Sequence, residues 1–139
     1  MTNILIFIWQ LPQNMLGLIL FGLFRHDART ADYRGIRVMR SPKMKGGISL
    51  GYYVIVSRHA SETTVLHEWG HTRQSLMLGW LYFLIIGIPS FGWATSRTLF
   101  PALKKRNYYS FYTEKWADRL AGIKRKQKLK RNDDRKIGT

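Results

Sequence analysis

Two histidines lie four positions apart in the stretch VLHEWGHTRQ, and a glutamate follows the first of them directly. On a helix, residues at this spacing share a face, so the rings of His67 and His71 can reach one ion. Glu68 lies about 100° further round, where its carboxylate can hold a water without ligating the ion. This set predicts a Zn²⁺ cofactor with Glu68 as general base. The alternative is a solvated helix face that carries two surface histidines.

A third ligand is expected from the stretch YTEKWADRLAG, because no histidine follows His71 and the only glutamate after Glu68 is Glu114. Asp118 comes four residues later on the same helical face, where it can accept the free ring N–H of a ligating histidine. Two carboxylates at this spacing repel on a solvated face unless they share a cation. We therefore expect Glu114 to ligate the metal and Asp118 to orient an imidazole. Ala117 beside them allows the two helices to approach closely.

Other polar side chains are candidates for the cleft around the ion. Tyr108, Tyr109 and Tyr112 can donate a hydrogen bond to an oxyanion, although such tyrosines more often form a belt at a membrane interface. His59 precedes the histidine helix and can line the cleft or simply be exposed. Gln74, one turn after the second histidine, can hydrogen-bond within the cleft or be solvated.

The motifs HEWGH and TEKWAD together resemble the gluzincin pattern, which is HExxH followed by ExxxD. The ExxAD form is particularly similar to that of integral-membrane zinc endopeptidases of the CAAX-prenyl-protease kind. Small bacterial peptidases that pair an HExxHxxQ-like helix with a TEKxAD-like helix also look similar. The resemblance covers residues 48–122. It implies that His67, His71 and Glu114 ligate zinc, that Glu68 is the general base and that Asp118 supports a ligand.

The resemblance also implies that ISLGYYVIVS, residues 48–57, borders the cleft as a strand that pairs with extended substrate. The chain departs from the membrane endopeptidases in being much shorter and in having fewer apolar spans. It offers no obvious His or Arg counterpart for stabilising an oxyanion. Metal binding is therefore better supported by the motifs than catalysis is.

Charge and hydrophobicity are segregated along the chain. The 139 residues carry a formal net charge of +15, although 45% of them are hydrophobic and 14% aromatic. Residues 1–24 and 74–96 have no charged side chain, whereas most Lys and Arg lie in 25–45 and 97–136. This pattern favours an anionic lipid surface as partner over a nucleic acid, for which no stacking platform or binding motif is present. The absence of cysteine excludes disulfides and thiolate metal sites.

The N-terminal stretch from Ile4 to Phe24 is the strongest membrane candidate. As a helix at ~1.5 Å per residue it would measure about 31 Å, close to a bilayer core of roughly 30 Å. Pro12, Gln13 and Asn14 interrupt it, which fits either a kinked span or a helix lying in the interface. The alternative is a buried core helix.

The metal hypothesis constrains the apolar run 76–96, which lies between the ligands. If this run crossed a bilayer once, His67 and Glu114 would be on opposite sides. We therefore expect a hairpin, a re-entrant loop or a buried helix pair, with its turn at Gly87–Ser90. The basic blocks on both sides of the run agree with a cytoplasmic position for both.

The remaining elements are predicted from local signals. Strands are expected over residues 33–40 and 48–57, paired as a small antiparallel sheet. A helix should run from Glu62 to Leu78, with Ser61 as its cap and Gly79 as its stop. A last helix is expected from about Tyr108 to Ile123.

These observations predict a single membrane-associated metallopeptidase-like domain, α+β and mainly helical, over residues 1–139. It comprises a hydrophobic helix (1–24), a catalytic core (25–123) and a basic tail (124–139). The expected activity is zinc-dependent hydrolysis of a peptide or protein substrate on the cytoplasmic side of a membrane. The alternatives are a non-enzymatic basic membrane adaptor, a hydrolase of a lipid or a non-peptide amide and, ranked last, a nucleic-acid binder.

Overall fold

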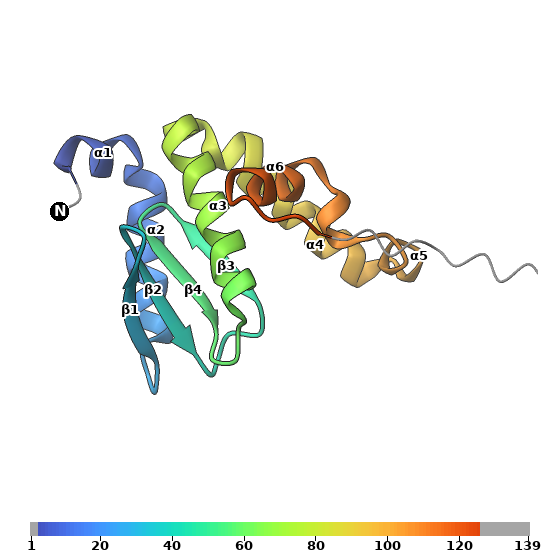
Figure 1. The fold of residues 1–139 in the computed structure, drawn as a ribbon, viewed down its shortest axis with the longest axis horizontal. Coiled ribbons are helices and arrows are strands. Elements are labelled where there is room, and N and C mark those ends of the chain that lie inside the picture. The colour runs from blue at the N-terminus through green and yellow to red at the C-terminus, as the bar shows by residue number, and fades with distance from the viewer. Residues whose placement is uncertain (1–2, 126–139) are drawn as a thin grey trace, which may run out of the picture.

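The computed structural model describes residues 3–125 as a four-stranded sheet with helices on both faces (Figure 1). The predicted α+β, mainly helical class is confirmed. The strands are β1 (Arg29–Tyr33), β2 (Ile36–Ser41), β3 (Gly47–Leu50) and β4 (Tyr53–Ser57), in the spatial order β1-β2-β4-β3. Strand β3 is therefore an edge strand.

The predicted antiparallel sheet is wrong, because the sheet is mixed. Residues 48–57 do not form one strand: the chain turns back at Gly51, whose φ of 63° suits glycine, so that β3 and β4 form an antiparallel hairpin. The second half of the run, β4, then pairs with β2 in parallel, while β1 and β2 are antiparallel.

The core lies between the sheet and helix α3 (Glu62–Leu78). Val54 and Val56 of β4 are fully buried against Val38 of β2 and Val65 of α3. The predicted bounds of α3 are confirmed: the Ser61 side chain accepts a hydrogen bond from the Thr64 backbone N–H, and the helix stops before Gly79. The sheet thus fixes the helix that carries both candidate histidine ligands.

The N-terminal stretch is two helices, α1 (Ile4–Trp9) and α2 (Leu11–Phe24), separated at Gln10. Helix α2 covers the sheet face opposite α3, where its Gly17 lies against the side chain of Tyr53 (Figure 1). The prediction of one long hydrophobic helix is wrong, since Pro12 occupies the first turn of α2, a position that needs no amide hydrogen.

Within residues 3–125, no single helix has both the length and the apolar composition of a membrane span. Two helical stretches, Glu62–Leu81 and Phe83–Leu99, pass that test only together, with a bend of 120° between them.

The expected reversal of the apolar run is present at a different place. The chain bends between Leu81 and Phe83, not at Gly87–Ser90. A π-helical stretch, Phe83–Gly87, continues directly into α4 (Ile88–Leu99), and Pro89 lies at the start of α4.

The chain then returns through α5 (Pro101–Lys104) to α6 (Tyr112–Leu120), which packs against α3. The predicted helix start at Tyr108 is wrong, since Tyr108–Ser110 form a separate 3₁₀ turn, in which the Asn107 side chain accepts a hydrogen bond from the Tyr109 backbone N–H. Most of the predicted basic tail, residues 126–139, lies outside the described residues.

Candidate metal centre

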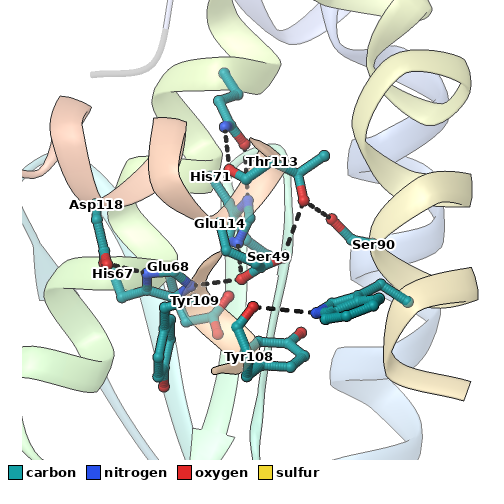
Figure 2. Close-up of polar contacts among 12 residues, drawn as sticks. Ser49, His67, Glu68, His71, Ser90, Tyr108, Tyr109, Thr113, Glu114 and Asp118 are labelled. Carbon is teal, nitrogen blue, oxygen red and sulfur yellow. Dashed lines mark hydrogen bonds and ion pairs between the residues drawn. The ribbon is translucent and has the colours of Figure 1, made fainter. Parts of the chain in front are cut away.

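Helices α3 and α6 bring three potential ligands together in the interior (Figure 2). His67, His71 and Glu114 each offer one ligand atom, and these atoms lie within 4.8 Å of one another. The exposed fractions of the three residues are 4%, 7% and 1%. The convergence predicted from the two motifs is therefore present in the structure.

The tautomer of His71 is determined by Gln74. The Gln74 amide nitrogen donates to the Thr113 backbone carbonyl at 2.8 Å, which directs the amide oxygen at His71 Nδ1, 2.7 Å away. An amide oxygen only accepts hydrogen bonds, so Nδ1 must carry a proton. In the neutral ring, Nε2 is then the nitrogen with the free lone pair.

His67 is oriented in the same way by a carboxylate. Its Nδ1 donates to Asp118 Oδ1 at 2.7 Å, as predicted for a residue that supports a metal ligand. Arg125 forms hydrogen bonds with both oxygens of Asp118, at 2.6 and 3.1 Å, and its guanidinium lies over the ring of Tyr109. The ring of Tyr109 in turn packs edge-on against His67. The imidazole is therefore held on two sides.

Both imidazoles consequently direct Nε2 at one carboxylate oxygen. Glu114 Oε2 lies 3.0 Å from His67 Nε2 and 3.4 Å from His71 Nε2. Three lone-pair donors this close repel one another unless a cation lies between them. Tetrahedral zinc with bonds of about 2.0–2.1 Å separates its ligand atoms by roughly 3.4 Å. The donor set therefore fits zinc in its chemistry, and the two distances to Glu114 Oε2 are close to this spacing.

In the metal-free protein, a proton has to fill the cation's role. Burial alone would lower the pKa of His71, but its hydrogen bond with Glu114 and the nearby charge of Glu68 raise that pKa above its ordinary value. Burial alone would raise the pKa of Glu114, but the hydrogen bonds from His67 and His71 hold it well below its usual range. These opposite shifts describe an ion pair between the His71 imidazolium and the Glu114 carboxylate.

Glu68 lies beside this cluster without being one of the three converging ligands. Its carboxylate packs so closely on Gly47 of β3 that a Cβ there would lie 2.2 Å from Glu68 Oε1. Burial raises the pKa of the Glu68 carboxyl above its ordinary value. A raised pKa suits a general base that takes up a proton and later returns it.

A cavity of about 910 Å³ opens beside the three ligands and Glu68. His59 and Tyr108, two of the candidates for the cleft, line this cavity. Burial raises the pKa of the Tyr108 hydroxyl, so this group stays protonated and can donate a hydrogen bond. Tyr112 does not line the cavity: the Tyr112 hydroxyl donates to the Ile85 backbone carbonyl at 2.7 Å, and the residue is 51% exposed. Gln74 acts behind His71 and does not line the cavity.

Several residues of the site were not predicted from the sequence. The Thr113 backbone carbonyl accepts the hydrogen bond that holds Gln74. The Thr113 hydroxyl donates to Glu114 Oε1 at 3.2 Å and accepts from Ser90 at 2.8 Å (Figure 2). Its position directly before Glu114 is the only local signal. The contact of Arg125 with Asp118 joins the start of the basic segment to the site, and composition alone assigned that segment to a tail.

Comparison of the chain with protein-family models, with curated proteins and with solved structures finds no match.

Proposed function

We propose that this chain is a zinc-dependent metallopeptidase. The observation that carries the proposal is the convergence of His67 Nε2, His71 Nε2 and Glu114 Oε2, with the far side of each imidazole fixed by an acceptor. The gluzincin-like pattern of the two motifs supports the same ligand set. Zinc suits two imidazoles and one carboxylate, and such a site keeps a position open for water or substrate.

The residues around the ion can divide the work of hydrolysis. Bound zinc supplies Lewis acidity, which polarises a carbonyl and lowers the pKa of water. Glu68 accepts the proton of the attacking water and passes it to the leaving amine. The hydroxyl of Tyr108, protonated and on the cavity wall, is a candidate donor to the developing oxyanion.

The position of β3 favours a peptide as substrate. Residues 46–50 line the cavity, and β3 has one strand neighbour, β4, in the part of the chain that the structure describes. The outer edge of such a strand offers backbone groups at regular spacing, to which an extended chain can add as a further strand. A peptide docked this way would run alongside Glu68, which contacts Gly47.

The experiment that tests the proposal compares Glu68→Gln with Glu62→Gln. Glu62 is on the same helix but is exposed, pairs with Arg40 at 3.0 Å and does not line the cavity. Zinc content is measured by atomic absorption, and turnover with a pool of fluorescence-quenched peptides. Glu68→Gln should keep one zinc per chain and lose about 10²–10⁴-fold in turnover, whereas Glu62→Gln should match the parent.

Two results would overturn the proposal. Turnover that persists in Glu68→Gln would show that Glu68 is not the base. A parent protein that purifies without zinc and takes up none would remove the metal site, and a non-enzymatic membrane adaptor would then be the better interpretation.

A further inference from the structure

Helix α2 buries its polar residues and exposes apolar ones. Its polar residues Gln13 and Asn14 are fully buried, whereas its apolar residues Leu18, Ile19 and Leu23 are 55%, 57% and 64% exposed. In water the hydrophobic effect favours the opposite arrangement, with amides outside and aliphatic side chains inside. An inverted helix of this kind is stable where its surroundings are themselves apolar.

The buried amides are fixed by specific hydrogen bonds. The amide of Gln13 donates to the Gly79 backbone carbonyl, at the end of α3. Asn14 donates to the Phe7 carbonyl at 3.0 Å and accepts from the Tyr52 backbone N–H at 2.7 Å. These contacts tie α2 to α1, to α3 and to the β3–β4 turn, so they determine which side of α2 faces outward.

A second apolar surface comes from the helical stretch Phe83–Leu99. Leu84, Ile88 and Phe91 are 65%, 63% and 74% exposed. Ile88 and Phe91 line the same cavity as Leu16 of α2, so both apolar surfaces border this cavity. Together these outer faces of Leu11–Phe24 and Phe83–Leu99 are called the lipid face below.

Two tryptophans lie next to the start of α2. The indole N–H of Trp9 donates to the Leu76 carbonyl at 2.9 Å, and that of Trp80 donates to the Ile8 carbonyl at 3.2 Å. Both residues remain at least half exposed, at 50% and 60%. Indoles with a satisfied N–H and an exposed apolar ring are typical of the boundary between lipid and water.

The charged side chains that directly follow the two helical stretches are positive. Neither helical stretch contains an acidic residue; α2 is followed by exposed Arg25, and α4 by exposed Lys104, Lys105 and Arg106. Basic side chains at the ends of apolar helices pair with anionic headgroups. We propose that the lipid face contacts the hydrocarbon of an anionic bilayer while these basic ends contact its headgroups. This surface is independent of the metal.

The test uses the full chain with one cysteine label at a time, which is simple because the natural sequence has none. An environment-sensitive nitrobenzoxadiazole dye is attached to Ile19→Cys, to Phe91→Cys or, as the matched control, to Thr63→Cys at an exposed position of α3. Vesicles of phosphatidylcholine, with and without phosphatidylglycerol, are then added, and binding is followed by flotation.

With phosphatidylglycerol present, dye emission at positions 19 and 91 should shift to the blue and rise several-fold, while position 63 stays unchanged. The protein should float with these vesicles and much less with phosphatidylcholine alone. Labels at 19 and 91 that stay in water on floated protein would overturn the lipid face. Labels already shielded in a sedimenting dimer, and unchanged by vesicles, would assign the surface to a second copy of the chain and also overturn it.

Discussion

Gln74 decides which nitrogen of His71 faces Glu114. Its amide has a donor end and an acceptor end, and the Thr113 carbonyl takes the donor end. The acceptor end is thereby left for His71 Nδ1, so the lone pair at Nε2 points into the site. Groups that hold metal-ligating histidines in this way fix the tautomer and the ring orientation and so contribute to metal affinity.

We therefore expect Gln74→Leu to weaken zinc binding about 10–100-fold, because the His71 ring loses the acceptor that fixes its tautomer and orientation. The matched control is Gln10→Leu. Gln10 is also buried and also hydrogen-bonds to α3, through Ser75 at 2.6 Å, but it contacts neither histidine. Competition with a fluorescent chelator measures both affinities. Equal losses in the two variants would show that the effect is general destabilisation and not ligand orientation.

The ligands and the supporting carboxylate of Asp118 could be predicted at this scale, whereas the support of His71 by Gln74 and Thr113 could not. His67 and His71 share a face through helical periodicity alone, and so do Glu114 and Asp118. The partner of Gln74 lies 39 positions away, and no local pattern connects the two. Tyr112 was misplaced for a related reason: a tyrosine at a helix start can point to either side, and here Ile85 captures its hydroxyl.

At the scale of helices and strands, the site depends on how closely α3 and α6 approach. A Cβ added at Gly70 would lie 2.2 Å from the backbone carbonyl oxygen of Ala117, so only glycine fits there. Ala117 is fully buried at this crossing. The sequence-based expectation that Ala117 permits a close approach is confirmed, and Gly70 is its counterpart on the histidine helix.

Gly70→Ala should therefore separate the helices that carry the ligands. The obstacle is backbone and cannot rotate away, so we expect a loss of about 1–3 kcal/mol in the free energy of unfolding together with weaker zinc binding. Gly92→Ala in α4 is the matched control, since a Cβ there meets nothing within 4 Å. It should raise stability by about 0.5–1 kcal/mol. Urea unfolding and zinc titration report the two effects, and a Gly70→Ala protein with parental zinc affinity would contradict this account.

Local signals determined the bounds of α3 well and strand pairing poorly. Ser61 and Gly79 predicted the ends of α3 because capping is a property of adjacent residues. The parallel pairing of β2 with β4 depends on whether an apolar run continues or folds back at Gly51, which is decided by tertiary contacts such as that of Asn14 with Tyr52. The bend of the apolar run was misplaced to Pro89 because proline ends a helix in one context and begins it in another.

At the scale of the whole molecule, the candidate metal centre and the lipid face share one cavity. Leu16, Ile88 and Phe91 form its apolar wall, and Glu68 with the ligands forms its polar end. If both proposals hold, a substrate segment enters the site from the side of the bilayer. The sequence indicated a membrane partner through its segregated charge, but which apolar side chains face outward depends on the buried amides of α2.

The net charge of +15 predicts how the lipid contact responds to salt and to truncation. Ending the chain after Arg125 removes six basic and two acidic side chains but retains the guanidinium that holds Asp118. Basic residues near an anionic surface contribute roughly 1 kcal/mol each, so affinity for phosphatidylglycerol vesicles should fall at least about tenfold at low salt. The salt dependence should become shallower as well, because fewer charges are screened.

At saturating lipid, the dye at Ile19→Cys should still report full immersion, since apolar contact is made by the helices. Unchanged affinity would exclude the removed segment from the headgroups, and a dye that returns to water would show that the lipid face cannot engage without it.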